Sequence, residues 1–514
     1  MMTPRPIRAP AVLAALLGGT LACAAGPAPL AAQVRVPGPS FEEVIGLRTA
    51  GSPAISPDGR SIVYTVRTTD WRDNRFDTEL WMARQGEASF QITRTEKGSS
   101  TSPRWSPDGR WIAFLADRGD RNQVYVLRAA GGEAQKLTAV KEGVNAFRWS
   151  PDGKRIAFSS TEAEDDRMRR RKERYGDFAV EDGEFRQAHL WSVDVPADLW
   201  AGATCPAPAR ADSARAADSV RTRSLCPAVP EPRRLTRGED FTVNGFAWSP
   251  DGTRIAFERR SDPLINSTST ADLWVLTLAS GESRPLVAGP GYEGNPVWSP
   301  DSRWVLYSTA AGDTTSSFYT NGQIAKIPAA GGTPVRLAAE IDEQLGSLAW
   351  TPTGIYLLAW EGTRRHLYAV DPGTGRARRL AGTPDAVLAF DFSADGRTLA
   401  LLAQTPTTVA EVYRTPLAPL RPVAVTDLSR QIEGWGLGTS EVVSWTSTDG
   451  ERVEGVLHKP RGFDPTRRYP LFVVIHGGPT SIDYPAPVAG YVYPVLQWLA
   501  RGALVLRPNY RGSA

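Results

Sequence analysis

A short turn signature divides most of the chain into repeated blocks of apolar strands. It consists of an aromatic or apolar residue followed by Ser-Pro-Asp-Gly or a close variant. The copies begin at Ile55, Trp105, Trp149, Trp248, Trp298, Trp350 and Phe392, and the last three are weaker. Proline fixes φ, aspartate accepts hydrogen bonds from the nearby backbone, and glycine tolerates positive φ. Each copy therefore predicts a tight turn between two strands.

Each turn is followed by three apolar segments of strand length. In the second repeat these segments are residues 111–115, 124–126 and 136–138. Together with the strand before the turn, each repeat holds four strands. Seven such repeats predict an all-β fold, a seven-bladed β-propeller over residues 41–430. The near-continuous apolar runs are typical of strands that neighbouring blades cover on both faces.

The step between the third and fourth copies is about twice as long as the others, yet it holds only one set of strand signals. We therefore predict one blade with insertions at residues 161–187 and 196–231. The first insertion contains the basic run 167–172, which is typical of a solvated surface. The alternative is that an insertion gates or lines a binding site, because long loops are often functional.

The pattern changes after residue 430. An apolar strand at 471–475 runs directly into His476, Gly477 and Gly478, and a helix is predicted over 491–501 with Gly502 at its end. A second apolar strand follows at 503–507. Strand, helix and strand predict the start of an α/β domain over residues 438–514. We expect residues 504–506 to form an unpaired apolar element of its sheet.

Three features in this order resemble the prolyl oligopeptidase family of serine peptidases: the propeller turns, the strand ending in His-Gly-Gly-Pro, and the run Asn-Tyr-Arg-Gly-Ser at 509–513. The acylaminoacyl-peptidase and dipeptidyl-peptidase branches are the most similar. The resemblance implies short peptide substrates, access restricted by the propeller, and an oxyanion-hole region at His476, Gly477 and Gly478. Glycine there lets backbone N–H groups approach a developing oxyanion. The alternative is an ordinary strand-to-helix turn.

The chain departs from the family in one important respect. No Gly-x-Ser-x-Gly occurs in it, and its four histidines all precede any position for that motif. The resemblance therefore implies a truncated hydrolase domain, with the Ser-Asp-His triad beyond residue 514 and no catalytic residue in this chain. We expect the chain to be an amino-terminal fragment that is inactive alone. The alternative is a periplasmic propeller that acts as a binding or scaffold protein without catalysis.

Specificity within the family is open on sequence grounds. Amino-dipeptidases of this family hold the free amine of the substrate with carboxylates from the propeller side. Glu181, Asp182 and Glu184, in the first insertion, are candidates for that role by composition. The alternative is a solvated acidic loop. The sequence does not separate dipeptidyl, acylaminoacyl and endopeptidase cleavage, nor does it set an oligomeric state.

The amino terminus is predicted to be a signal peptide over residues 1–32. Arg5 and Arg8 precede an apolar run at 11–25, and small residues follow. This run is shorter than a membrane span requires, so we expect an exported protein without a transmembrane segment after cleavage. A lipoprotein site at Cys23 is the alternative. An oxidising compartment would permit a disulfide between Cys205 and Cys226, although two unpaired cysteines fit the sequence equally well.

Charge and composition narrow the class of partner. The 514 residues carry a net charge of +3, and this is too small for a nucleic-acid-binding surface. Three cysteines and four histidines without a ligand-type spacing predict no metal site, and we expect no cofactor.

Overall fold

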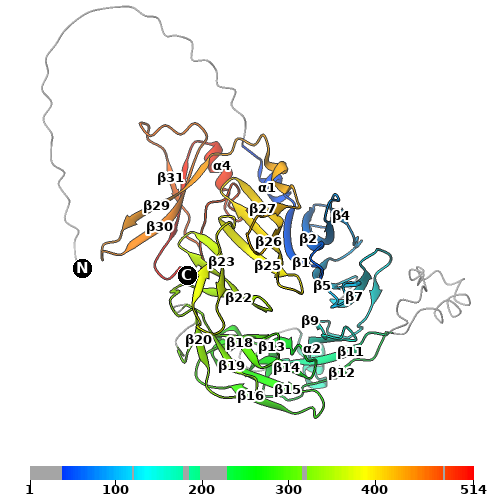
Figure 1. Cartoon of the computed structure of the whole chain (residues 1–514). Helices are drawn as coiled ribbons and strands as arrows, with labels where there is room; N and C mark the ends of the chain where they lie inside the picture. The colour runs from blue at the N-terminus through cyan, green and yellow to red at the C-terminus, as the bar shows by residue number, and fades with distance from the viewer. Residues whose placement is uncertain are drawn as a thin grey trace, which may run out of the picture. The chain divides into compact units, whose positions relative to one another are not determined.

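The computed structural model describes residues 38–118, 121–176, 185–196, 229–314, 321–478 and 481–513 (Figure 1). The following predicted features lie outside these residues: the leader 1–32 with Cys23, the carboxylates Glu181, Asp182 and Glu184, and the cysteines Cys205 and Cys226. Among the described helices, none has the length and apolar character needed to cross a bilayer.

Four-stranded antiparallel meanders follow one another along residues 49–424 of the described chain. The first contains β1 (Thr49–Ile55), β2 (Ser61–Asp70), β3 (Arg75–Arg84) and β4 (Phe90–Gln91). The later strands are β5 (Ser100–Trp105), β6 (Trp111–Ala116), β7 (Gln123–Arg128), β8 (Gln135–Lys136), β9 (Ala146–Trp149), β10 (Arg155–Thr161), β11 (Ala188–Asp194), β12 (Arg233–Arg234), β13 (Thr242–Trp248), β14 (Arg254–Arg260), β15 (Asp272–Thr277), β16 (Ser283–Val287), β17 (Glu293–Trp298), β18 (Trp304–Thr309), β19 (Gln323–Pro328), β20 (Val335–Leu337), β21 (Leu345–Thr351), β22 (Gly354–Glu361), β23 (Arg364–Val370), β24 (Ala377–Arg379), β25 (Ala386–Phe392), β26 (Thr398–Thr405), β27 (Thr408–Pro416) and β28 (Val423–Ala424). A parallel pairing of β23 with β25 joins the last two meanders into one eight-stranded sheet. The fold of this region is therefore mostly β and propeller-like.

Short helices interrupt or flank the meanders. They are α1 (Phe41–Ile45), α2 (Asp166–Tyr175), and the 3-10 helices η1 (Ile265–Thr270) and η2 (Leu428–Ile432). Helix α2 lies between β10 and β11, within the first predicted insertion, and none of its residues is buried. The long step between turn copies thus corresponds to a single sheet, β9–β12.

The turn signature has a repeated hydrogen-bond geometry. Ser56 Oγ donates to Asp58 Oδ1 at 2.6 Å, and the same oxygen accepts from Arg60 N at 3.0 Å. Gly59 has a φ of +72°, which favours glycine. The Ser-to-Asp bond recurs at 2.5–2.6 Å from Ser106, Ser150, Ser249, Ser299 and Ser393. The bond from Ser299 is the main reason that the pKa of Asp301 falls to about 2.

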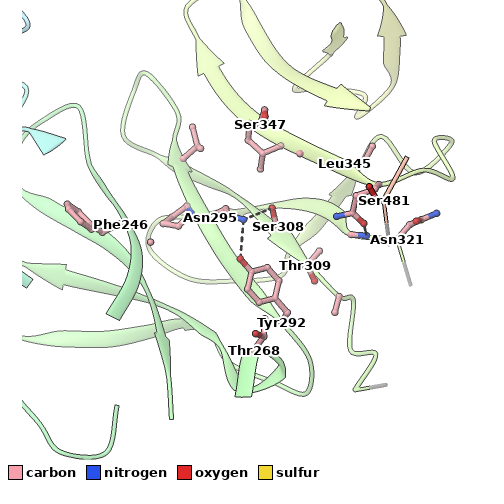
Figure 2. Close-up of a pocket in the computed structure, with 18 of the residues that line it drawn as sticks. Phe246, Thr268, Tyr292, Asn295, Ser308, Thr309, Asn321, Leu345, Ser347 and Ser481 are labelled. Atoms are coloured by element: carbon pink, nitrogen blue, oxygen red, sulfur yellow. Dashed lines mark hydrogen bonds between the residues drawn. The ribbon is translucent and has the colours of Figure 1, made fainter. Parts of the chain in front are cut away.

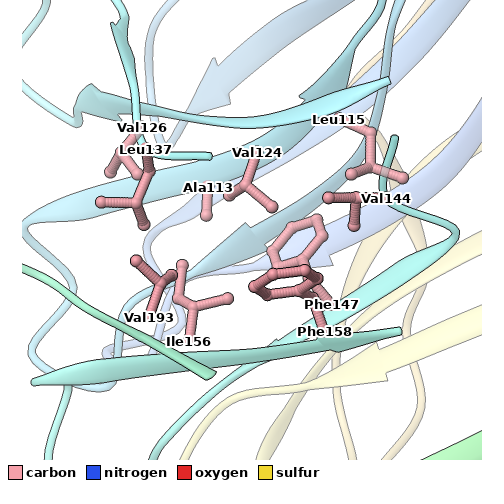
Figure 3. Close-up of a cluster of buried hydrophobic side chains, with 10 residues drawn as sticks. All are labelled: Ala113, Leu115, Val124, Val126, Leu137, Val144, Phe147, Ile156, Phe158 and Val193. Carbon is pink, nitrogen blue, oxygen red and sulfur yellow. The ribbon is translucent and has the colours of Figure 1, made fainter. Parts of the chain in front are cut away.

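Apolar side chains fill the space between neighbouring sheets. Figure 3 shows one such cluster, in which Ile156 and Phe158 of β10 lie with Ala113, Leu115 and Val124 of the preceding meander. All of these side chains are at most 4% exposed. Burial of each large apolar side chain contributes roughly 1.5–3 kcal/mol. These clusters therefore stabilise the stacking of sheet on sheet.

The first and the last four-stranded meanders, which are far apart in the sequence, also pack together. Ile55 N, on β1, donates to Asp391 Oδ2, on β25, at 2.9 Å, and Ala394 N donates to Pro57 O at 3.0 Å. One buried cluster includes Tyr64 of β2 and Val412 of β27. The first meander is thus held against the last.

The C-terminal sheet has the order β29 (Thr439–Thr446), β30 (Arg452–Lys459), β32 (Leu504–Asn509), β31 (Leu471–Val473). Strands β31 and β32 are parallel, and α4 (Val495–Ala500) lies between them in sequence. The expectation that residues 504–506 would be unpaired is wrong, because β32 pairs with β30 on one side and β31 on the other. The apolar edge of this sheet is β31 instead.

Helix α4 is shorter than the predicted 491–501. It begins at Val495, directly after Pro494, and ends before Gly502, whose φ is +83°. A proline disfavours helical geometry in the residue before it, so Tyr493 cannot extend the helix. The glycine signal placed the C-terminus correctly, while the proline overrode the apolar pattern at the N-terminus.

Candidate active-site region

His476 and Ser513 meet where two parallel strands end. The loop after β31 carries His476, and the loop after β32 carries Tyr510 and Ser513. His476 Nε2 lies 3.0 Å from Ser513 Oγ, and the imidazole stacks on the Tyr510 ring at 4.5 Å between centroids. Tyr510 OH also donates to His476 O at 3.0 Å. Ligand sites of open α/β sheets lie at this carboxyl edge.

The His476–Ser513 contact is not arranged as a nucleophile and its base. Ser513 Oγ already donates its proton to Tyr510 O, so the imidazole Nε2–H is the donor to Ser513. A nucleophilic serine needs the opposite, a histidine nitrogen that accepts its proton. The other ring nitrogen, Nδ1, faces Gly477 O at 3.3 Å rather than a carboxylate. The contact therefore fixes the two loops together.

Gly477 and Gly478 leave the backbone of this loop accessible. A Cβ atom at Gly477 would meet nothing within 4 Å, and Gly478 has a φ of +142°, where side chains are disfavoured. Two successive glycines at the end of a central strand can present N–H groups to a substrate carbonyl oxygen. The geometry is therefore compatible with the oxyanion-hole region expected at His476, Gly477 and Gly478.

A buried ion pair supports the neighbouring loop. Asp483 Oδ1 lies 2.7 Å from Arg507 Nη2, and the two side chains are 8% and 16% exposed. Asn509 accepts from Asp483 N and donates to Asp483 O, both at 2.8 Å. Burial raises the pKa of Asp483, and the Arg507 and His476 charges oppose that shift. These contacts fix residues 481–483 beside the His476 loop.

His458, on β30, is a buried histidine away from the loop. Its side chain is 4% exposed overall, and Nε2 has no hydrogen-bond partner among the described atoms. Burial, reinforced by the Arg507 charge, lowers the pKa of His458 to about 4. The imidazole is therefore neutral at pH 7.

A cavity of about 920 Å³ is lined by both the propeller-like sheets and loops that follow strands of the C-terminal sheet. Ser481, Gly512 and Ser513 line it from the hydrolase-like side. The propeller-like sheets and their loops contribute Arg148, Phe246 and a hydrogen-bonded group around Asn295. Figure 2 shows this group, in which Asn295 Nδ2 donates to Tyr292 OH at 3.1 Å and lies 3.5 Å from Ser308 Oγ. The volume is typical of a site for a small ligand.

Two carboxylates are buried behind the cavity wall. Glu258 is 0% exposed and accepts from Asn244 Nδ2 at 3.0 Å and from Tyr292 OH at 3.2 Å. Glu293 accepts from Thr309 Oγ1 at 3.0 Å, and burial raises its pKa to about 7. Tyr292 and Thr309, rather than the carboxylates, line the cavity. Among the described side chains, no group of three metal-ligand types is close enough to hold a metal ion.

The sequence identified the His476 loop but missed most of the cavity. Arg148, Tyr292 and Ser513 were not singled out, although Ser513 ends the Asn-Tyr-Arg-Gly-Ser run. A signal for Arg148 was present, because it directly precedes the Trp149 turn copy. The proposed amine-binding carboxylates lie outside the described residues and stay a prediction.

A model of the TolB beta propeller domain matches residues 43–181. The match covers the first part of the region in which the turn signature predicts a propeller. It supports the propeller assignment independently of the signature count.

Known peptidases align along most of the chain. Dipeptidyl-peptidase 5 of Porphyromonas gingivalis is 26% identical over 474 residues, which cover 89% of this chain and 66% of the relative. The uncharacterized peptidase YuxL of Bacillus subtilis is 24% identical over 546 residues, covering 92% of this chain and 70% of the relative. The chain thus spans about two thirds of the length of the curated relatives it matches.

Solved structures show the same fold. Acylaminoacyl peptidase of Pyrococcus horikoshii superposes with a TM-score of 0.66 at 17% identity, over 92% of this chain and 66% of that structure. The resemblance to peptidases that the motifs indicate is thereby confirmed, since the relatives are named dipeptidyl-peptidase 5 and peptidase YuxL and the structural neighbour is an acylaminoacyl peptidase.

Proposed function

We propose that this chain is the amino-terminal part of an exported serine peptidase, in which a seven-bladed propeller restricts peptides entering the active site of an α/β-hydrolase domain. The observation that carries the proposal is the cavity of about 920 Å³. Residues of the propeller-like sheets line one part of it, and the loops beside His476 line another. A peptide held there would lie against both parts of the molecule.

The chemistry follows the triad mechanism of serine hydrolases. A serine would attack the scissile carbonyl, a histidine would accept its proton, and Gly477 or Gly478 N–H would stabilise the oxyanion. The serine, histidine and aspartate would come from residues after 514, since the relatives are longer than this chain.

The edge of the C-terminal sheet supports this extension. Leu471 and Val473 of β31 are each 53% exposed, and Ile475 is 61% exposed. Large apolar side chains on a sheet edge are an aggregation hazard unless another element covers them. A further strand or helix of the hydrolase domain would bury this edge.

Export is proposed from the leader pattern at residues 1–32, with the mature protein in the periplasm or outside the cell. A non-catalytic propeller that binds a partner is the second candidate, and the match to the TolB propeller model fits it. That candidate gives no reason for the cavity to include the loops around His476.

The test is hydrolysis by the complete reading frame. Purified protein is assayed with dipeptidyl and N-acetyl-aminoacyl 4-nitroanilides, alongside a Ser→Ala variant in its Gly-x-Ser-x-Gly motif. We expect nitroaniline release from one class of substrate and its loss in the variant. Absence of hydrolysis with both classes, or activity that survives the Ser→Ala change, would contradict the proposal.

A further inference from the structure

The first strand of each four-stranded meander carries one residue at an equivalent register position, directly before the aromatic or apolar residue of the turn signature. These residues are Ala54, Arg104, Arg148, Ala247, Val297, Ala349 and Asp391. Each is paired with a residue of the second strand within two positions of the end of the ladder at the turn. Most are small or apolar, so the two arginines are exceptional.

Arg148 lines the cavity without a carboxylate partner among the described residues. Its Nη1 donates to Phe147 O at 2.8 Å, and its Cζ lies 5.9 Å from the ring centroid of Phe246, which also lines the cavity. Five donors are available on a guanidinium, so these contacts leave most of them for a ligand.

The surroundings of Arg148 favour an anion. Burial, and then the charge of Arg104 on the neighbouring sheet, lower the pKa of Arg148 to about 9, so the side chain stays charged at pH 7. A desolvated cation beside a like charge is stabilised when a negative group enters. Asp391, the acidic member of the register set, is already bound to Ile55 N and interacts with Arg104 rather than with Arg148.

Other residues that line the cavity present neutral polar groups. Glu258 is fully buried, and both of its oxygens accept hydrogen bonds, from Asn244 and Tyr292. The cavity surface there consists of the Tyr292 hydroxyl, the Asn295 amide and Ser308. A peptide backbone can hydrogen-bond to such groups, and a carboxylate would be drawn to Arg148.

We infer that Arg148 binds a carboxylate of the peptide in this cavity and so selects short peptides that carry a negative charge. The inference rests on the proposed peptidase function and adds a specificity residue to it. Guanidinium and carboxylate form paired hydrogen bonds of defined geometry, which lysine would not reproduce. The carboxylate can be the C-terminal one or an Asp or Glu side chain.

The experiment uses the full-length protein and matched peptides of four to six residues. One pair differs in a free C-terminal carboxylate against an amide, and a second pair differs in Glu against Gln at one position. We expect kcat/KM for one charged peptide to exceed that of its neutral partner at least about tenfold, mainly through KM. The pair that shows the preference identifies the source of the carboxylate.

Arg148→Gln is expected to abolish that preference, whereas Arg148→Lys keeps part of it. Arg110→Gln is the control, because Arg110 pairs with Asp108 in an exposed turn. Equal rates for charged and neutral peptides in the wild type, or a preference that survives Arg148→Gln, would overturn the inference while the peptidase function stands. If no peptide is hydrolysed, calorimetric binding of the same pairs decides, and equal affinities would overturn it.

Discussion

Gly294 packs against the Tyr292 hydroxyl and a buried carboxylate. A Cβ atom at Gly294 would lie 2.3 Å from Tyr292 OH and 2.4 Å from Glu258 Oε2, whereas one at Gly245 would lie 3.7 Å from the same carboxylate oxygen. We predict that Gly294→Ala lowers the free energy of unfolding by about 1–3 kcal/mol, the usual cost of overpacking, and that Gly245→Ala changes it by less than about 1 kcal/mol. Urea unfolding of the two variants measures this difference. Equal effects would mean that the Tyr292 and Glu258 side chains relax freely.

His458 makes stability depend on pH. Its pKa is lowered by burial to about 4 in the folded protein, against roughly 6.5 in an unfolded chain. Between these values the unfolded chain binds a proton that the folded protein does not. The contribution of neutral His458 to the free energy of unfolding is therefore fully present above about pH 6.5. It is lost as the pH is lowered toward about 4, which decreases the free energy of unfolding by on the order of 3 kcal/mol.

The His458→Leu variant tests this dependence. We expect the difference in unfolding free energy between pH 7 and pH 4.5 to shrink by about 2 kcal/mol relative to the wild type. Thermal or urea unfolding at the two pH values gives the comparison. The same difference in both proteins would show that other groups cause the acid sensitivity.

At the scale of elements, indole hydrogen bonds connect neighbouring sheets. Trp298 Nε1 donates to Ala247 O at 3.1 Å, while Trp248 Nε1, in the equivalent position of the preceding sheet, has no partner among the described atoms. Both rings are buried, and an arginine stacks on each, Arg254 at 4.8 Å and Arg155 at 5.1 Å. The two tryptophans thus differ mainly in this one bond.

We predict that Trp298→Phe destabilises the protein by about 1 kcal/mol more than Trp248→Phe, because only the first change leaves a carbonyl without its donor. Denaturant midpoints of the two variants, measured side by side, test the prediction. A larger effect at Trp248 would show that ring packing, rather than the bond, decides the cost.

The elements themselves were largely predictable. Turn signatures such as Ser56–Gly59 encode their own hydrogen bonds, so the strands on either side follow from local sequence. The strand pairing in the C-terminal sheet was not predictable, because β32 pairs with β30, which lies about fifty residues earlier in the chain. Periodicity shows that a strand is apolar but does not show which strand lies beside it.

The candidate site divides in the same way. His476, Gly477 and Gly478 are recognisable from a local sequence motif at the end of a strand. Arg148 and Tyr292 lie far from that motif in sequence, and only the packing of sheets brings them to one cavity with Ser513. Long-range assembly of this kind leaves no local pattern beyond the register position that Arg148 occupies.

At the scale of the whole molecule, the proposed peptidase activity requires a reactive serine outside this chain. The most direct measurement isolates the protein from its native source, labels it with a fluorophosphonate, and maps the labelled peptide together with the intact mass. We predict a mass well above the 55.8 kDa of this chain and one labelled serine within a Gly-x-Ser-x-Gly peptide. A protein with a mass that matches this chain less its leader, and with no labelled serine, would contradict the account.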